Sequence, residues 1–368
     1  MTELRGKNIL LVSPEPWDHI FVSKHHYAIH LGVRGNKVFF LGPPGNSDET
    51  EETQYNNVTH LKYKGFVKGL RFLPSLLAKR AIRSVYYKLQ QLAGVTFDVV
   101  WSFDNSVFFD FSALPERVLK ISHIVDMSQN FQTAKAASTA NYAFAVTSNI
   151  KNKLLSFQPH TYFINHGYNY SEKEKRNQTL PGVNKFKAVY AGNLAISYLD
   201  WPLLLKATTE NPNVDFILLG PGNEDHSTIS REMRNSKEEC LSCPNVYTPG
   251  RVNGDELLSW YKSADVLILV YDQEYQEELT NSHKMMEYLG SGKMIVATKT
   301  KEYIELAKRE LIVMADQNVE YPKLLNEVVR QIESWNCELK QEKRKGFALN
   351  NTYEKQIERI ERLILEKA

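Results

Sequence analysis

Residues 280–298 read TNSHKMMEYLGSGKMIVAT, which is a polar loop, a helix-length segment, a glycine turn and a short apolar strand. Another apolar run, at 265–271, comes before this stretch. Strand, helix and strand thus follow one another, and that alternation is typical of a parallel sheet with connecting helices. This unit predicts an α/β fold.

The same alternation extends through the rest of the chain. Short apolar runs are separated by helix-length segments, and the runs are nearly continuous, as in parallel strands that are covered on both faces. The predicted strands are 8–13, 37–41, 98–103, 118–125, 142–148 and 160–165 in the first half, and 187–192, 215–220, 245–249, 265–271, 294–298 and 311–315 in the second. We predict two Rossmann-like, doubly wound parallel-sheet domains that face each other across a cleft.

A polar stretch separates the two halves. A chain of 368 residues is long for one compact core, and residues 169–184 are polar and contain Pro181-Gly182, as expected of a linker. The predicted domains are therefore 1–168 and 185–349. Apolar residues recur at helical spacing near the end of the sequence, so we expect a helix at 350–368 that packs back on the first domain.

Composition excludes several classes of protein. The formal net charge of +2 is too small for a typical nucleic-acid-binding protein, which carries a large basic excess on one face. The first residues resemble no leader peptide, and no apolar run approaches the roughly 18 residues that span a bilayer. We expect a cytoplasmic protein. Its three cysteines fit reduced thiols better than a disulfide framework.

The polar loop before the predicted helix suits an anionic ligand. In doubly wound sheets, ligands bind beyond the carboxyl ends of the strands. Asn281, Ser282, His283 and Lys284 would lie at a helix N-terminus, where free N–H groups and a cation favour a diphosphate. Glu287, three residues after Lys284, would face the same ligand and accept two ribose hydroxyl groups. The alternative is an ordinary Lys–Glu pair on an exposed helix face.

The same segment resembles the donor site of GT-B glycosyltransferases, particularly the family 4 type and the glucuronosyltransferase-like enzymes of bacterial polysaccharide assembly. The residues that match this pattern in order are Lys284, Glu287, Tyr288, Leu289, Gly290, Gly292 and Lys293. The resemblance implies transfer of a hexose-type sugar, such as galactose, glucose or a uronic acid. The donor would be a nucleotide diphosphate sugar, UDP-linked by family habit, and the acceptor a glycan or lipid-linked oligosaccharide in bacterial surface or capsular polysaccharide synthesis.

The resemblance also implies roles for residues around this segment. Arg251 would stack on the base or pair with phosphate, although an Arg in a solvated loop is an equal alternative. Tyr271 and Glu278 follow a predicted strand where family members often place a carboxylate near the transferred sugar. Glu278 precedes Glu287 by nine residues, whereas the family 4 pair is spaced by eight, so this match is imperfect.

One departure from the family 4 pattern concerns phosphate binding. An Arg and a Lys usually follow the first strand of the second domain, but this chain has Gly192 and Asn193 there. Their backbone and amide groups could still approach the phosphate. Lys284 would then be the principal phosphate cation, and the stereochemistry of transfer, retaining or inverting, stays open.

The first domain is expected to hold the acceptor. The loop after the first strand contains Trp17, Asp18 and His19, and the helix that follows contains His25 and His26. The resemblance places Asp18 and His19 near the sugar, and Trp17 is either a stacking platform for it or part of the core.

Another strand of this domain ends at Asp126. Asp126 could accept the proton of the attacking hydroxyl in an inverting reaction, or it could cap a helix.

No Asp-x-Asp sequence occurs in the chain. That pair holds the divalent ion in the metal-dependent GT-A transferases, so we predict no required metal or other cofactor besides the nucleotide-sugar co-substrate.

Residues 62–92 form a local basic segment. No Asp or Glu occurs between Gln54 and Phe97, whereas lysines and arginines alternate with apolar residues. Such a segment could lie on an anionic membrane, which would place the enzyme at the inner face of the plasma membrane. The alternative is a solvated helix face that covers its own core.

Three other functions fit parts of the sequence. A nucleotide-sugar 2-epimerase has the same layout but a denser set of acid, base and Arg residues. A non-catalytic two-lobed sugar-binding protein has no reason to combine Lys284 with Glu287 after a polar helix start. A nicotinamide dehydrogenase is disfavoured because no Gly-x-Gly-x-x-Gly follows Ser13.

Overall fold

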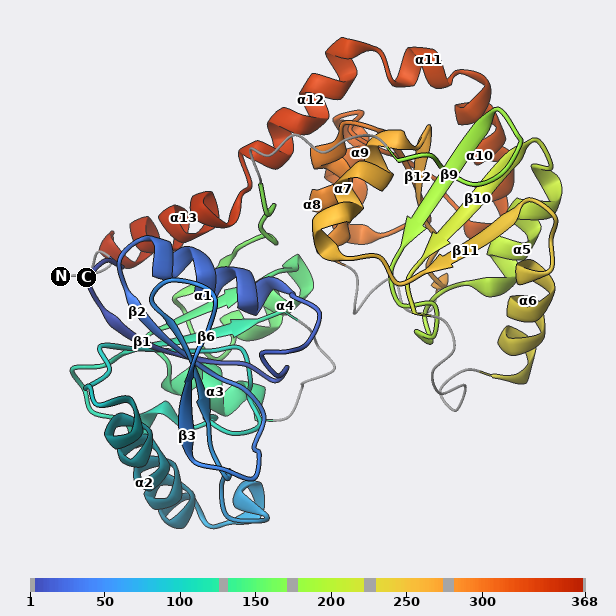
Figure 1. Cartoon of the computed structure of the whole chain (residues 1–368). Coiled ribbons are helices and arrows are strands. Elements are labelled where there is room, and N and C mark those ends of the chain that lie inside the picture. The colour runs from blue at the N-terminus through green and yellow to red at the C-terminus, as the bar shows by residue number, and fades with distance from the viewer. Residues whose placement is uncertain (1–3, 126–131, 171–177, 222–229, 274–280, 367–368) are drawn as a thin grey trace. The chain divides into compact units, whose positions relative to one another are not determined.

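A computed structural model describes residues 4–125, 132–170, 178–221, 230–273 and 281–366. The chain divides into two compact units (Figure 1). The first unit contains Met1–Gly167 together with Tyr353–Ala368, and the second contains Tyr168–Thr352. Each unit is built on its own β-sheet.

The first unit contains an eight-stranded sheet in the order β3-β4-β2-β1-β5-β6-β7-β8. All neighbouring strands are parallel except β3 and β4. The strands are β1 (Asn8–Val12), β2 (Lys37–Leu41), β3 (Glu49–Glu52), β4 (Val58–Lys62), β5 (Val99–Ser102), β6 (Leu119–Ile124), β7 (Tyr142–Ala145) and β8 (Thr161–Phe163).

Helices cover both faces of this sheet. The helices are α1 (Ser23–Val33), α2 (Ser75–Ala93), α3 (Thr133–Thr139), α4 (Ser148–Leu155) and α13 (Tyr353–Leu365), with short 3-10 turns η1 (Leu70–Phe72) and η2 (Phe111–Ala113). Leu10 and Val12 of β1 pack in the cluster that contains α2, whereas Ile9 and Leu11 pack with α1 and α13. A central strand buried on both faces must be apolar throughout, which explains the nearly continuous apolar runs.

The second unit contains a six-stranded, fully parallel sheet in the order β11-β10-β9-β12-β13-β14. Its strands are β9 (Phe186–Ala191), β10 (Val214–Leu219), β11 (Val246–Gly250), β12 (Val266–Leu269), β13 (Met294–Ala297) and β14 (Val313–Met314). Its helices are α5 (Trp201–Glu210), α6 (Arg231–Leu241), α7 (Gly254–Ser263), α8 (Lys284–Ser291), α9 (Ile304–Lys308), α10 (Tyr321–Arg330), α11 (Ile332–Trp335) and α12 (Glu338–Leu349), with turns η6 (Lys301–Tyr303) and η7 (Asn318–Glu320).

The strand order of the second unit reverses between β9 and β12. The chain runs from β9 outward to β10 and β11, and then returns to place β12 on the other side of β9. The connections on the two sides leave in opposite directions at such a switch point, so a crevice opens beyond the carboxyl ends of these two strands.

The predicted fold class is confirmed, since both sheets are of the doubly wound α/β type. Strands β3 and β4 were not predicted. β3 has the sequence ETEE and is fully exposed, so it carries no apolar pattern. It is an antiparallel edge strand, and its glutamates discourage pairing with another chain.

A buried arginine fixes α12 against the loops around α8. Arg344 is fully buried, and its guanidinium donates hydrogen bonds to the carbonyl oxygens of Leu311, Gly292 and Trp335 at 2.9–3.0 Å. Burial lowers the pKa of Arg344 to about 10. Because Gly292 is the residue that ends α8, this contact holds the C-terminal end of the helix in place.

Close packing also fixes the last turn of α8. The Tyr168 ring lies directly against Gly290, and a Cβ atom at position 290 would overlap the ring. The backbone N–H of Tyr168 donates to the Asn351 carbonyl at 2.8 Å, so the ring cannot withdraw easily.

Gly290→Ala inserts a methyl group into this contact, and we expect the free energy of unfolding to fall by about 1–3 kcal/mol. Gly346→Ala in α12 is the matched control, because a Cβ there meets nothing within 4 Å. The higher helix propensity of alanine predicts a gain of up to about 1 kcal/mol at Gly346. Urea unfolding followed by circular dichroism measures both changes, and equal effects at the two glycines would contradict the packing argument.

Candidate functional site

Three of the predicted donor-binding residues come together at the switch point of the second unit. Gly192 directly follows β9, Tyr271 lies two residues after β12, and Lys284 is the first residue of α8. Lys284 approaches both of the other residues, although it is separated from them by long stretches of sequence.

Lys284 is a buried cation that forms no ion pair with a carboxylate in the part of the chain that the structure describes. Lys284 is only 9% exposed, and its Nζ donates a hydrogen bond to the Tyr190 hydroxyl at 3.3 Å. The same Nζ lies 4.6 Å from the centre of the Tyr190 ring and 5.6 Å from that of Tyr271. No carboxylate among the described residues forms an ion pair with it. Aromatic faces stabilise a desolvated ammonium group by about 2 kcal/mol, so the charge remains largely uncompensated until an anion binds.

Gly192 allows the lysine to lie this close to the strand end. A Cβ atom at position 192 would collide with the Lys284 ammonium group and the Tyr190 hydroxyl. The backbone N–H of Gly192 donates to the Leu219 carbonyl at 2.8 Å, so this N–H is not the group that meets an anion. Asn193 is exposed, and its Oδ1 accepts from the Ala195 N–H at 2.8 Å. Its Nδ2 amide is therefore the end that it could offer a phosphate.

Glu287 lies one helical turn after Lys284 and is half-buried. Its Oε2 accepts a hydrogen bond from the Tyr261 hydroxyl at 3.3 Å. Burial raises the pKa of Glu287 to about 7, against the opposing effects of the Tyr261 hydrogen bond and the Lys284 charge. A carboxylate with such a pKa is readily available to accept hydroxyl hydrogen bonds above neutral pH.

The rest of the helix start is also held by the second unit. The Ser282 N–H donates to the Tyr303 hydroxyl at 2.8 Å, Asn281 is buried, and His283 is the residue that precedes α8. Tyr271 is buried, and its N–H donates to the Thr298 hydroxyl at 2.9 Å.

One predicted residue is not brought to this point, and another is not described. Arg251 is exposed and follows β11, the edge strand that is separated from β9 by β10. Glu278 lies outside the described residues.

Three tyrosines support the site; the sequence predicted no role for Tyr190 and Tyr261, and it indicated Tyr288 only as a member of the matching pattern. Tyr190 contacts Lys284, Tyr261 holds Glu287, and the Tyr288 hydroxyl accepts from the Ala191 N–H at 2.9 Å at the end of β9. All three are buried, so the sequence gives the signal of core residues. Their hydroxyl groups nevertheless form the polar lining that positions the lysine and the glutamate.

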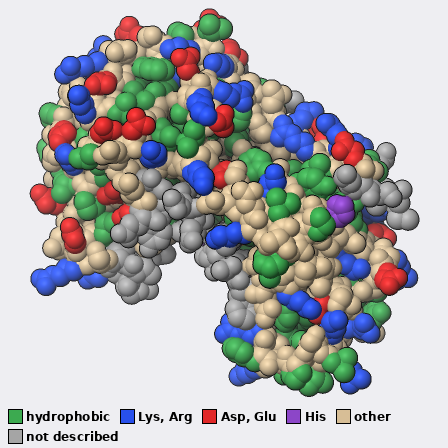
Figure 2. Space-filling model, turned by 180° about the vertical axis from the view of Figure 1, so that it is seen from behind, with side chains coloured by type: hydrophobic (Ala, Val, Ile, Leu, Met, Phe, Trp, Pro, Cys, Tyr) green, Lys and Arg blue, Asp and Glu red, His purple; other side chains and the backbone are tan. Residues whose placement is uncertain are grey.

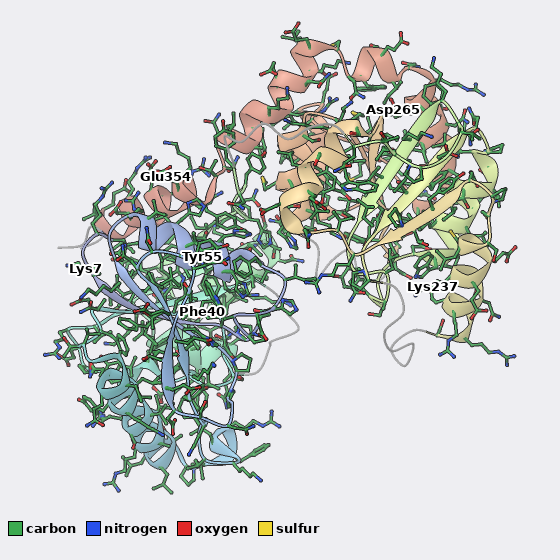
Figure 3. The ribbon with its side chains drawn as sticks, in the orientation of Figure 1. Lys7, Phe40, Tyr55, Lys237, Asp265 and Glu354 are labelled. Atoms are coloured by element: carbon green, nitrogen blue, oxygen red, sulfur yellow. The ribbon has the colours of Figure 1, made fainter. Side chains whose placement is uncertain are left out.

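In the first unit, Trp17 belongs to an aromatic cluster. Its ring meets Phe40 edge-on at 4.9 Å and Tyr55 at 6.0 Å between centroids. Phe40 and Tyr55 are labelled in Figure 3 within the same unit. Trp17 is half-buried, so packing accounts for much of its surface.

His25 is fully buried, and both of its ring nitrogens have partners. Nε2 donates to the Pro16 carbonyl at 3.0 Å, and Nδ1 accepts from the Val22 N–H at 3.2 Å. Burial lowers the pKa of His25, which favours this neutral form. Neither ring nitrogen is left to bind an acceptor substrate. His25 instead holds the loop after β1 in place.

The other acceptor-side residues differ in exposure. His26 is half-buried against the Tyr353 ring at 4.8 Å, and burial lowers its pKa to about 3. Asp18 and His19 are exposed on the loop after β1. Asp126 lies outside the described residues.

The described part of the chain contains no group of three or more His, Cys, Asp and Glu side chains arranged to hold a metal ion. None of its helices is both long enough and apolar enough to cross a bilayer.

Sequence comparisons match the second unit. Residues 187–331 match the family described as glycosyl transferases group 1. The teichuronic acid biosynthesis glycosyltransferase TuaH of Bacillus subtilis (strain 168) is 23% identical over 161 residues. This match covers 39% of the chain and only 38% of the relative's own length.

Solved structures match nearly the whole chain. Sucrose-phosphate synthase from Thermosynechococcus elongatus has a TM-score of 0.71 at 13% identity, with 98% of each chain covered. HepE from Anabaena, in complex with UDP and glucose, has a TM-score of 0.65 at 14% identity, with 98% of this chain and 99% of that chain covered. At these identities the likeness concerns the fold, which is that of the GT-B enzymes. The predicted resemblance is confirmed at the level of the fold, which is the GT-B fold, and in the second unit, where residues 187–331 match the glycosyl transferases group 1 family.

Proposed function

We propose that this chain transfers a hexose-type sugar from a nucleotide diphosphate sugar, with UDP as the nucleotide, to a glycan or lipid-linked oligosaccharide in bacterial surface polysaccharide synthesis. The buried ammonium group of Lys284, which forms no ion pair with a carboxylate of the described residues, is the observation that carries this proposal. Anabaena HepE has been solved with UDP, with UDP and glucose, and with UDP-glucose, which supports a uridine nucleotide.

The donor would bind with its diphosphate against Lys284 at the start of α8. The ammonium group then gains the anionic partner that the described residues do not supply, and the N-terminal end of the helix adds a favourable dipole. Glu287 accepts hydrogen bonds from the ribose hydroxyls, and Tyr261 fixes the orientation of its carboxylate. Tyr271, Asn193, Asn281, Ser282 and His283 would line the donor, with Arg251 and Glu278 as further contacts.

Transfer with inversion of the anomeric configuration needs a base on the acceptor side. We assign this role to Asp126, which follows β6, with Asp18 and His19 near the sugar. The acceptor oxygen forms the new bond to the anomeric carbon and gives its proton to the carboxylate, while the bond to the diphosphate oxygen breaks. The positive field of Lys284 stabilises the negative charge that develops on this leaving group.

The acceptor and the cellular location are also part of the proposal. The name of the Bacillus subtilis relative refers to teichuronic acid biosynthesis, and by analogy we assign this chain to a glycan-building pathway. We place the enzyme in the cytoplasm at the inner face of the membrane, where a lipid-linked acceptor is accessible.

Lys284→Ala tests the donor site. Of UDP-, GDP- and TDP-glucose, we expect only UDP-glucose to raise the melting temperature of the wild-type chain. The variant should bind it about tenfold to a hundredfold more weakly, because a charge-assisted phosphate contact contributes about 1.5–3 kcal/mol. Differential scanning fluorimetry and titration calorimetry measure the two effects.

The control for this test is Lys301→Ala, because Lys301 is an exposed lysine of the same unit. It should bind the donor like the wild type. The ligand-free Lys284→Ala chain should be at least as stable as the wild type, since the substitution removes a desolvated charge. Undiminished donor binding by Lys284→Ala would exclude this site.

Glu287 predicts a pH dependence of donor binding. The carboxylate, rather than the carboxylic acid, accepts two hydroxyl groups, so affinity should rise about tenfold between pH 6 and pH 8 as the group ionises around its pKa of about 7. Glu287→Gln should bind weakly and without this pH dependence. In the ligand-free chain, by contrast, the free energy of unfolding should fall as the pH rises over this range.

The sign of that trend follows from the raised pKa of Glu287 in the folded chain. Its contribution to stability is complete below the ordinary value of 4.5 and is lost as the pH rises through about 7. Glu287→Gln should therefore flatten this part of the stability profile. Calorimetric titrations and thermal melts across this range measure both slopes, and a wild-type profile retained by the glutamine variant would remove Glu287 from the site.

A further inference from the structure

Four large apolar side chains point outward within residues 67–77 of the first unit. Phe72 is 76% exposed, Leu76 65%, Val67 55% and Leu77 47%. We call Val67, Phe72, Leu76 and Leu77 the apolar tip. Exposed apolar residues are common singly, but four within eleven residues require a reason.

The backbone holds the tip in this orientation. The Leu70 N–H donates to the Val67 carbonyl at 3.2 Å, and the Phe72 N–H donates to the Gly69 carbonyl at 2.8 Å. Leu70 itself is buried and anchors the turn η1 to the core. Pro74 directly precedes α2, and Leu76 and Leu77 lie in the first turn of this helix. Of the leucines in this stretch, only Leu70 is buried, whereas Leu76 and Leu77 are exposed.

The remainder of α2 behaves differently. Ala78, Ile82, Tyr86 and Leu89 recur at helical spacing and are buried in the core of the first unit. For this part of the basic segment 62–92, the helix covers its own core, as the alternative prediction held. Within this segment, the apolar tip and the cations beside it are therefore the part that remains available to contact a membrane.

Cations surround the tip. Lys68, Arg71 and Arg80 are exposed, and the Arg71 guanidinium lies over the Phe72 ring at 4.9 Å. Figure 2 shows hydrophobic and Lys or Arg side chains side by side at the lower end of this unit. Among the described residues, no carboxylate forms an ion pair with Lys68 or Arg80.

Other cations of the segment are already neutralised. Lys62 pairs with Glu51 at 2.9 Å, and Lys88 pairs with Asp48 at 2.7 Å. Glu51 and Asp48, near β3, thus compensate two cations of the segment, but neither pairs with Lys68 or Arg80 beside the tip. This distribution favours an anionic partner at the tip.

We propose that the apolar tip and its cations dock the first unit on the surface of an anionic lipid bilayer. These cations are the exposed Lys68, Arg71 and Arg80, together with the half-buried Lys79. Apolar side chains enter the boundary between headgroups and acyl chains, while lysines and arginines remain at the level of the lipid phosphates. Lys68 and Lys79 favour the lipid surface over a protein partner, because lysine is depleted in protein–protein interfaces, where arginine and phenylalanine are enriched. A phosphate-bearing lipid layer matches both components.

Sedimentation with lipid vesicles tests the proposal on the full chain. Vesicles of phosphatidylcholine and phosphatidylglycerol in equal parts should bind the wild type, and vesicles of phosphatidylcholine alone should bind it much more weakly. The triple variant Lys68→Gln, Lys79→Gln, Arg80→Gln should lose about a hundredfold in affinity, from about fivefold for each cation. High salt should weaken the wild type in the same way.

The apolar part has its own variant. Phe72→Ser with Leu76→Ser should reduce vesicle binding by at least about tenfold, since each side chain loses its apolar transfer energy. The matched control is Val319→Ser with Leu339→Ser, which removes two exposed apolar residues from the second unit. The control should bind vesicles like the wild type, and all variants should melt normally because these side chains are exposed.

Three results would overturn the proposal. The wild type could fail to bind the anionic vesicles, or the tip and control variants could lose binding equally. The wild type could also sediment as a dimer that Phe72→Ser with Leu76→Ser makes monomeric, which would assign the tip to a second copy of the chain. Stabilisation by UDP-glucose is measured in parallel, so failure of this surface is distinguished from failure of the donor site.

Discussion

The second unit depends on the placement of one positive charge. The Lys284 ammonium group lies at the switch point of the sheet, between the rings of Tyr190 and Tyr271, with no acidic partner among the described residues. A protein that only needed a stable core would replace this lysine with an apolar residue, because a desolvated charge costs several kcal/mol. Its presence is understandable where a negatively charged ligand supplies the missing interaction.

Several independent contacts restrict where that charge can lie. Gly192 leaves room for the ammonium group, and Tyr168 packs on Gly290 in the same helix. Arg344 holds the carbonyl of Gly292 where the helix ends. A site formed on a helix that is fixed along its length does not have to be ordered when the ligand arrives, so less binding energy is lost to reorganisation.

Much of this arrangement could be predicted from the sequence. The twelve predicted strands all occur, because strands buried on both faces leave long apolar runs. The hairpin of β3 and β4 could not be predicted, since ETEE shows no apolar pattern. Lys284 and Glu287 were recognised because a polar loop, a helix and a glycine turn leave a local pattern.

Contacts between distant segments could not be predicted in this way. Tyr190 and Tyr261 have the sequence signature of core residues, and their hydroxyl contacts depend on how β9, α7 and α8 meet in three dimensions. His25 illustrates the converse, because a histidine near the expected cleft is fully used by the Pro16 and Val22 backbone.

The first unit is discontinuous in sequence, and this has a consequence for biosynthesis. Ile357, Ile360 and Ile364 of α13 belong to the core that contains β1, yet they are translated after the whole of the second unit. During translation, the first unit therefore keeps an apolar face exposed until α13 has been synthesised. The second unit can complete its fold before that point. The order of completion is the reverse of the usual one, in which domains fold from the N-terminus onward.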